Sequence, residues 1–233
     1  MIKEGRAAKR PARRVELPRA VRSDRSVYDP DCARCPRLAQ FLAECHARYP
    51  SYWCRPVDSF GDTAPRIVLV GLAPGLHGAN RTGRPFTGDY AGILLYETLF
   101  ELGLATQRES TSVSDPLELK GVRIVNSVKC VPPGNKPLPE EIRNCNVYLA
   151  AELARLSSAR VLVALGRIGH DAVLLALGLK RSTFPFAHGA QHQLGGARRL
   201  LDSYHCSRYN TQTGRLTAAM FRAVLTRALE LAS

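Results

Sequence analysis

A glycine-rich segment, residues 71–89, contains side chains suited to binding and catalysis. It holds four glycines after Gly71, together with His77, Asn80 and Asp89. Glycines let a ligand approach the backbone closely, and successive backbone N–H groups can bind an anion. The segment is neither a Walker A loop nor a dinucleotide-binding fingerprint, because its glycine spacing differs and no Gly-Lys-Ser/Thr follows.

Two further polar segments come directly after apolar runs. Asn126 ends one run, and its amide can donate and accept hydrogen bonds at once, which suits the edge of a pyrimidine base. His205 follows another run, with Arg208 and Tyr209 just beyond it. A lone histidine is more often structural than catalytic. Three polar strand ends that converge on one edge nevertheless favour a catalytic site.

The seven cysteines indicate reduced thiols or a metal site rather than disulfides. Their odd number and the absence of an apolar leader predict a reducing, cytoplasmic location. Four thiolates can hold a [4Fe–4S] cluster or a zinc ion. Spacing leaves two candidate sets open, which are Cys32, Cys35, Cys130 and Cys145, or Cys32, Cys35, Cys45 and Cys54.

A parallel sheet would bring these segments together. Buried parallel strands are expected at residues 66–73, 122–129, 160–166 and 198–204. Helices are expected at residues 91–103, 139–156, 168–177 and 217–231. This alternation predicts an α/β fold with helices on both faces of the sheet and functional residues at the carboxyl ends of the strands.

Charge favours a polyanionic partner. The 233 residues include 33 Lys and Arg against 20 Asp and Glu, a formal net charge of +13, and nucleic acid suits such a balance. No stretch approaches the roughly 18 apolar residues of a membrane span. Residues 1–26 carry nine Lys or Arg and three acids. They predict a flexible basic arm, either DNA-binding or merely solvated, before a single domain at 27–233.

Three motifs, in order, resemble the signatures of the uracil-DNA glycosylase superfamily, in particular family 5, the type B iron–sulfur enzymes. They are Gly71-Leu-Ala-Pro-Gly75 with Gly83-Arg-Pro-Phe-Thr-Gly88, then Asn126-Ser-Val-Lys-Cys130, then His205-Cys-Ser-Arg-Tyr-Asn210. The resemblance runs from about Cys32 to the C-terminus. It implies a three-layer α/β/α sandwich with a central four-stranded parallel sheet. It also implies a [4Fe–4S] cluster on Cys32, Cys35, Cys130 and Cys145.

The resemblance further implies hydrolysis of the N-glycosidic bond of a flipped-out uracil, without a lyase step. Phe86 would stack on the base, Asn126 would bind its Watson–Crick edge, and His205 would donate to O2, where negative charge develops. Arg208 and Tyr209 would enter the duplex as a wedge. The implied partner is DNA with uracil or another damaged base, bound by a monomer. The remaining expected substrate contacts are Gly71, Ala73, Gly75, His77 and Asn210.

Departures from the family pattern affect which residue positions the attacking water and which bases the pocket accepts. Ala73 aligns with the water-activating aspartate of family 1, so another residue must position the water. We expect Asn80 in this role, with Asp89 second. Gly75 aligns with a tyrosine that blocks the thymine methyl group, which predicts tolerance of bulkier bases.

Two other functions remain open from the sequence. A catalytically weak protein that binds uracil or damaged DNA would keep the fold and lose turnover, and Ala73 favours this alternative. A small-molecule enzyme that uses the first loop to bind phosphate is disfavoured by the charge of +13 and by the missing phosphate fingerprints.

Overall fold

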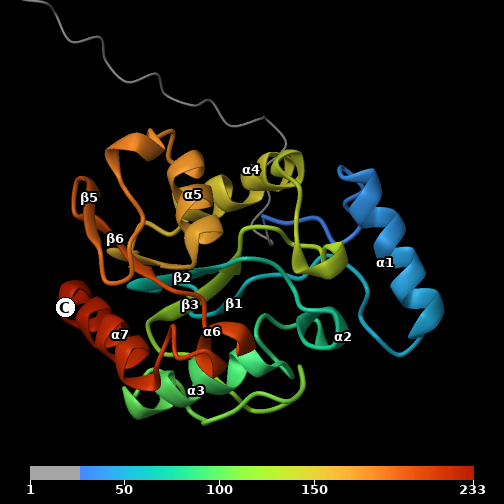
Figure 1. Ribbon diagram of the computed structural model, residues 1–233, viewed down its shortest axis with the longest axis horizontal. Coiled ribbons are helices and arrows are strands. Elements are labelled where there is room, and N and C mark those ends of the chain that lie inside the picture. The colour runs from blue at the N-terminus through green and yellow to red at the C-terminus, as the bar shows by residue number, and fades with distance from the viewer. Residues whose placement is uncertain (1–26) are drawn as a thin grey trace, which may run out of the picture.

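A computed structural model describes residues 27–233 and contains one six-stranded sheet in the order β1-β3-β2-β4-β6-β5 (Figure 1). Four parallel strands form its centre, as the sequence predicts. They are β3 (Val122–Asn126), β2 (Ile67–Gly71), β4 (Val161–Leu165) and β6 (Arg198–Ser203). These strands are largely buried on both faces, which is typical of a parallel sheet.

Two antiparallel edge strands extend the sheet beyond the four that were predicted. β1 (Phe60–Gly61) pairs with β3, and β5 (Gln191–Gly195) pairs with β6. β1 has only two residues, and β5 alternates exposed and half-buried residues. Neither strand has the continuous apolar run that identifies a buried strand in a sequence.

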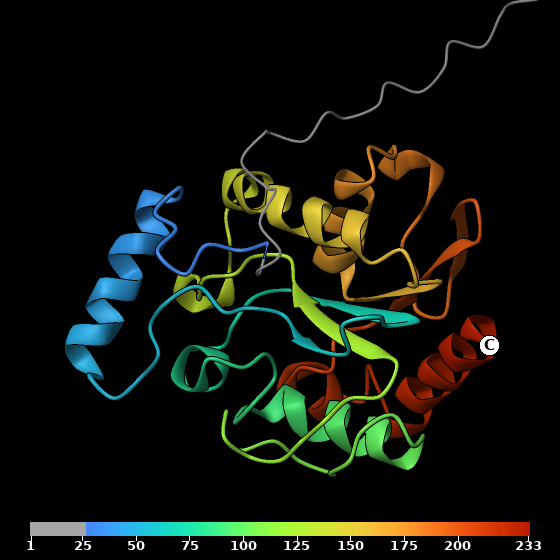
Figure 2. The same ribbon diagram turned by 180° about the vertical axis from the view of Figure 1, so that it is seen from behind.

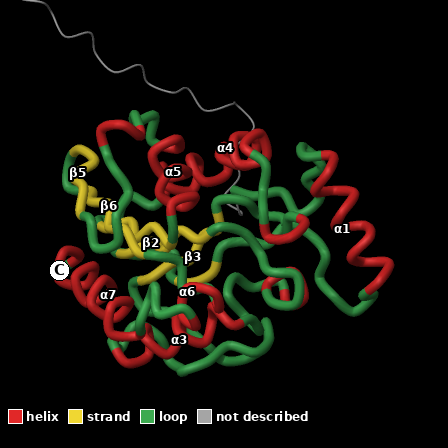
Figure 3. The backbone as a smooth tube through the Cα atoms, in the orientation of Figure 1, coloured by secondary structure: helices red, strands yellow, loops and turns green. Residues whose placement is uncertain are grey.

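Helices cover both faces of the sheet, which confirms the predicted α/β/α sandwich (Figure 3). α3 (Tyr90–Glu101) and α7 (Ala218–Ala232) pack on one face, whereas α4 (Pro139–Arg155) and α5 (Arg167–Ala176) pack on the other. Successive strand residues point to opposite faces. Leu69 therefore belongs to the core beside α3 and α7, and Val70 to the core beside α4 and α5.

α1 (Pro36–Arg48) stands at the side of the sandwich, as Figure 2 shows from behind. This helix is not among those predicted from the sequence, although Leu38 and Leu42 start a buried stripe at helical spacing. The stripe packs against the segment that follows β3. Arg37 also pairs with Glu141 of α4 at 2.7 Å, so α1 is attached to the domain by an apolar cluster and an ion pair.

The segment after α1 is bonded to the glycine-rich loop. The N–H groups of Trp53 and Cys54 donate to the carbonyls of Arg81 and Asn80, each at 3.1 Å. The remaining short elements are α2 (Ala79–Thr82), α6 (Arg208–Gln212) and the 3-10 turns η1 (Pro133–Asn135) and η2 (Arg181–Thr183). The chain that leaves α1 therefore positions α2.

The register of the sheet aligns the ends of its parallel strands. Gly71 pairs with Asn126, and Leu165 pairs with Ser203. The three polar segments consequently start from one edge of the sheet. The predicted basic arm, residues 1–26, lies outside the described residues. Within residues 27–233 no helix is long and apolar enough to cross a membrane.

Candidate active site

Four of the predicted site residues meet where β2, β3 and β6 end. A Cβ atom at Gly71 would lie 2.7 Å from Asn126 Oδ1 and 2.9 Å from the Phe86 ring. The Phe86 ring faces the His205 ring, with centroids 6.0 Å apart and planes at 24°. Position 71 therefore requires glycine, because the amide and the aromatic ring close over the end of β2.

Asn126 and Asn80 hold the two buried side-chain oxygen atoms that lack a hydrogen-bond partner within the described residues. Buried polar groups are almost always hydrogen-bonded, and leaving one unpaired costs roughly 1–3 kcal/mol. Asn126 is only 2% exposed. Its Oδ1 lies over Gly71, close to the Phe86 ring, so a planar ligand stacked on that ring could satisfy it with an N–H group.

His205 is neutral and available for binding. Burial lowers the pKa of its imidazole to about 4, so the ring carries no charge at neutral pH. The loop that carries it is fixed by Asn210, whose Nδ2 donates to the His205 carbonyl at 2.8 Å. The amide of Asn210 thus holds the His205 loop in this structure, and its contact with the substrate stays a prediction.

The two candidates for orienting a water molecule differ in their surroundings. Asn80 is fully buried, and its Nδ2 donates to Cys54 Sγ at 3.6 Å. Asp89 is half-buried and caps α3, with Oδ1 accepting the Gly92 N–H at 2.9 Å. Its Oδ2 lies against Gly78, 2.5 Å from where a Cβ atom there would stand. Burial raises the pKa of the Asp89 carboxyl, although two backbone N–H groups oppose this.

The other predicted residues of the first loop lie at different depths. Ala73 and Gly75 are half-buried. His77 is exposed, and its Nδ1 lies 3.1 Å from the Tyr52 hydroxyl. His77 is therefore hydrogen-bonded to a tyrosine of the segment after α1.

The two predicted wedge residues lie on α6, beside the start of α3. Arg208 and Tyr209 are exposed, Tyr209 to 70%. The Arg208 guanidinium lies 5.8 Å from the centroid of the Tyr90 ring, which is also exposed. This group presents two aromatic rings and a cation to solvent.

A pocket of about 400 Å³ opens beside His205 and contains two cations that sequence reasoning missed. Arg167 lies 5.2 Å from the Phe186 ring centroid, and Arg215 lies 4.7 Å from that of Tyr204. A glycine between β4 and α5, at the same sheet edge, is the sequence signal that could have indicated this part of the site. Arginines in this position are suited to binding phosphate oxygens.

The structure brings four of the cysteines to one cavity. Cys32, Cys35, Cys130 and Cys145 all line it, whereas Cys45 and Cys54 do not. Two N–H groups point at these sulfurs. The Lys129 N–H donates to Cys145 Sγ at 3.2 Å, and Asn144 Nδ2 donates to Cys35 Sγ at 3.7 Å. Such hydrogen bonds are typical of cysteines that ligate a metal centre.

The spacing of these sulfurs fits a cluster better than a single zinc ion. Zinc–sulfur bonds of about 2.3 Å in a tetrahedron put the sulfurs roughly 3.8 Å apart. No three of the four sulfurs lie within 4.8 Å of one another. A cubane cluster separates its ligands more widely, so the set of four thiolates suits [4Fe–4S].

A second group of potential metal ligands is already satisfied by hydrogen bonds. His170, His192 and Asp202 lie together. The two nitrogens of His170 face two acceptors, Asp202 Oδ1 at 2.7 Å and the Phe184 carbonyl at 2.8 Å. Although burial opposes it, Asp202 raises the pKa of His170. Acceptors on both sides favour a proton on each nitrogen, and these contacts join α5 to β6.

Comparison with known proteins identifies the class that this fold and site define. A family model described as the uracil DNA glycosylase superfamily matches residues 59–229. The chain therefore belongs to the uracil DNA glycosylase superfamily. This match confirms the resemblance predicted from the three motifs.

Among individual relatives, those of higher identity are type-5 uracil-DNA glycosylases. The chain is 52% identical to a type-5 uracil-DNA glycosylase of Thermus thermophilus over 206 residues, covering 86% of this chain and 94% of the relative. It is 43% identical to a type-5 uracil-DNA glycosylase of Pyrobaculum aerophilum, covering 92% and 95%. A type-4 uracil-DNA glycosylase of Archaeoglobus fulgidus is 33% identical, covering 64% and 69%.

Proposed function

We propose that this protein is a monofunctional uracil-DNA glycosylase that hydrolyses the N-glycosidic bond of a flipped-out uracil and leaves an abasic site. One observation carries the proposal. The unpaired Asn126 Oδ1 lies over Gly71, close to the Phe86 ring, and a neutral His205 faces that ring. An acceptor, a stacking surface and a neutral donor are the groups that uracil requires.

The proposed base contacts stabilise the departing uracil. The ring would stack on Phe86, N3–H would donate to Asn126 Oδ1, and Asn126 Nδ2 would donate to O4. As the C1′–N1 bond breaks, its electron pair moves onto the base and negative charge grows on O2. An N–H group of neutral His205 would donate to that oxygen. A preorganised donor of this kind lowers a barrier by roughly 3–4 kcal/mol.

DNA would approach over the same edge of the sheet. Arg208 and Tyr209 would fill the space that the flipped nucleotide leaves. Arg167 and Arg215, in the pocket beside His205, would contact backbone phosphates. A protein that reads one lesion with one such site needs no symmetry, so we infer a monomer.

We propose that Asp89, rather than Asn80, activates the attacking water molecule. A carboxylate can accept the proton that water loses as its oxygen bonds to C1′, and burial raises the pKa of Asp89 toward the range useful for a base. Asn80 cannot accept a proton, and its amide nitrogen donates to Cys54 Sγ. This assignment reverses the order expected from the sequence.

Asp89→Asn is therefore expected to slow uracil release by about 100-fold under single-turnover conditions, at the lower end for general-base catalysis. Asparagine caps helices as well as aspartate does, so α3 keeps its cap. Asn80→Ala serves as the comparison and should retain the rate within about threefold. Equal losses in the two variants would contradict the assignment to Asp89.

Gly71→Ala is expected to lower the rate by about 100-fold, because displacement of catalytic groups by about 1 Å can have an effect of that size. A methyl group at position 71 would push Asn126 Oδ1 or the Phe86 ring away. Gly103→Ala provides a control for strain without crowding, since a Cβ atom there meets nothing within 4 Å but the φ of 72° disfavours a side chain, and it should lower the Tm and leave the rate unchanged. Full activity of Gly71→Ala would show that Asn126 and Phe86 do not bind the base as proposed.

Base release from a labelled duplex with one U·G pair tests the function, with alkali to cleave the abasic site. We expect cleavage after alkali and not before it. Because Gly75 offers no side chain to the pocket, duplexes with 5-hydroxymethyluracil, ethenocytosine, hypoxanthine or xanthine should also react. Release of uracil alone would contradict this breadth. Tight binding without release would instead identify a damaged-DNA sensor, which Ala73 favours.

We also propose that Cys32, Cys35, Cys130 and Cys145 hold a [4Fe–4S] cluster. When bound, the cluster would cross-link the N-terminal side of α1 to α4 and to the segment after β3. The hydrolysis described above uses only protein side chains and water.

A further inference from the structure

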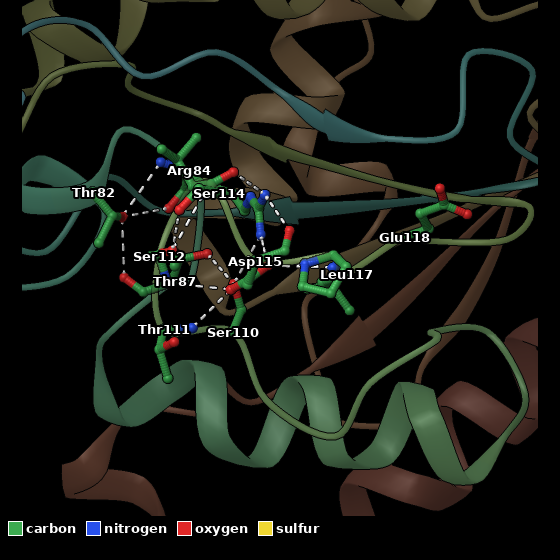
Figure 4. Close-up of polar contacts among 12 residues, drawn as sticks. Thr82, Arg84, Thr87, Ser110, Thr111, Ser112, Ser114, Asp115, Leu117 and Glu118 are labelled. Atoms are coloured by element: carbon green, nitrogen blue, oxygen red, sulfur yellow. Dashed lines mark hydrogen bonds and ion pairs between the residues drawn. The ribbon is translucent and has the colours of Figure 1, made fainter.

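A buried network connects the first motif to a loop outside all three motifs (Figure 4). Arg84, two residues before Phe86, is only 7% exposed. Its guanidinium donates to Ser110 Oγ at 3.2 Å, to Asp115 and to the Val113 carbonyl. A buried charge needs a partner of opposite sign, and Asp115, with a side chain 13% exposed, supplies it.

Asp115 also organises the loop that contains it. Its Oδ2 accepts hydrogen bonds from Ser110 Oγ at 3.1 Å, from Thr111 N–H at 2.9 Å and from Ser112 N–H at 3.1 Å. Although burial opposes it, Arg84 and these N–H groups hold the pKa of Asp115 below its ordinary value. The Asp115 carboxylate therefore both holds the loop together and pairs with Arg84.

The same loop bonds to the residues that follow Phe86. Thr87 Oγ1 lies 2.7 Å from Ser110 Oγ, and the Gly88 N–H donates to the Ser110 carbonyl at 3.0 Å. Phe86 between these attachments has φ of 55°, in the left-handed region. That conformation is unfavourable for a residue with a bulky side chain, and it persists only where surrounding contacts enforce it.

α3 fixes the other side of this segment. The Tyr96 hydroxyl, fully buried, donates to the Pro85 carbonyl at 2.7 Å. The Phe86 carbonyl approaches Gly92 so closely that a Cβ atom there would lie 1.8 Å from its oxygen. The backbone on both sides of Phe86 is thus bonded to a loop and a helix that lie outside the residues proposed to contact the base.

We propose that Arg84, Ser110 and Asp115 are positioning residues for the base pocket, because they hold Phe86 in the strained conformation that turns its ring toward His205. This inference rests on the proposed function, since stacking of the base on Phe86 belongs to it. It adds a requirement that the three motifs do not contain. The loop at 110–115 must keep its hydrogen bonds to residues 84–88 for Phe86 to offer a preformed stacking surface.

Binding to two uncleavable duplexes tests the inference without turnover. One carries 2′-fluoro-2′-deoxyuridine opposite guanine, and the other carries a tetrahydrofuran abasic site, which has no base to stack. Fluorescence anisotropy gives the ratio of the two Kd values. We expect the wild type to prefer the fluorouridine duplex. Asp115→Asn should reduce this preference about tenfold, within the range known for stacking of one base. Ser110→Ala, which removes only part of the network, should reduce it about threefold.

Glu109→Gln is the matched control, because Glu109 is exposed in the same loop, and it should leave the preference unchanged. Equal weakening of both duplexes by Asp115→Asn and Ser110→Ala would overturn the inference, because a general structural defect predicts that result. Thermal melting identifies variants that fail to fold. If Asp115→Asn does not fold, Ser110→Ala, which keeps the Arg84–Asp115 pair, decides the matter alone.

A double-mutant cycle provides the second test. If Asp115 acts through Phe86, adding Asp115→Asn to Phe86→Ala should slow single-turnover uracil release by less than twofold beyond Phe86→Ala alone. Additive losses would overturn the inference. A wild type that neither prefers the fluorouridine duplex nor releases uracil contradicts the proposed function, and the inference with it. A wild type that does both, with unaffected variants, contradicts the positioning role alone.

Discussion

His205→Ala is expected to slow single-turnover release of uracil by about 10²–10³-fold, because it removes the donor to the oxygen on which negative charge develops. The His205 ring faces Phe86 and makes no hydrogen bond within the described residues. Its removal therefore leaves no protein group newly unpaired. Binding of uncleavable uracil DNA should change much less than the rate, since the contact strengthens only as the bond breaks.

The pH dependence provides a second readout for this residue. With the pKa of His205 lowered from 6.5 to about 4, the ring stays neutral between pH 6 and 8, and the rate should show no inflection from it there. Because the unfolded chain binds this proton more readily, the stability that depends on the neutral ring is lost as pH falls from 6.5 toward 4.

His46→Ala is a suitable control, because His46 is exposed on α1, and this variant should react like the wild type. An inflection near pH 6.5 that disappears in His205→Ala would contradict the neutral histidine. A loss smaller than about tenfold in His205→Ala would contradict its role as the donor to O2.

Cys145→Ser is expected to abolish iron binding and to lower the Tm by about 10 °C. A ligand held at a thousand times its Kd adds about 4 kcal/mol of stability, and each kcal/mol corresponds to ~2–4 °C for a domain of this size. The sulfur of Cys145 lines the cavity shared by the four cysteines and accepts the Lys129 N–H. Iron content, visible absorption and thermal melting measure the effect.

Cys45→Ser is the matched control, because this buried cysteine lies outside that cavity. It should retain its iron and its colour. Full iron content in Cys145→Ser would exclude the proposed ligand set, and loss of iron from Cys45→Ser would favour the alternative set that spacing left open.

The sequence predicts most of what determines the position of Asn126 and His205. Each follows a short apolar run, which before His205 is only Leu200-Leu201, and the alternation of such runs with helices requires parallel strands whose ends share an edge. The edge strand β5 lacks that signal because it is polar and half-exposed. α1 has an apolar stripe, but the cysteines within and around it point to metal ligands rather than to a helix.

The surroundings of the first loop could not be predicted in the same way. The burial of Asn80 depends on Cys54, which lies 26 residues earlier. The polar composition of residues 107–116 is typical of a surface loop, yet Ser110 is buried against Arg84. Neither contact has a periodicity that a sequence displays, because both join irregular segments that are distant along the chain.

The hydrogen bonds from the segment after α1 to α2 link the cysteine cavity to the base pocket. α1 starts beside Cys35, and the chain that leaves it holds the carbonyls of Arg81 and Asn80. Two sites that share an ordered element are thermodynamically coupled, and the coupling is reciprocal. We therefore expect iron in the cavity to raise the affinity for DNA. By reciprocity, a bound lesion is expected to raise the affinity for iron by the same factor.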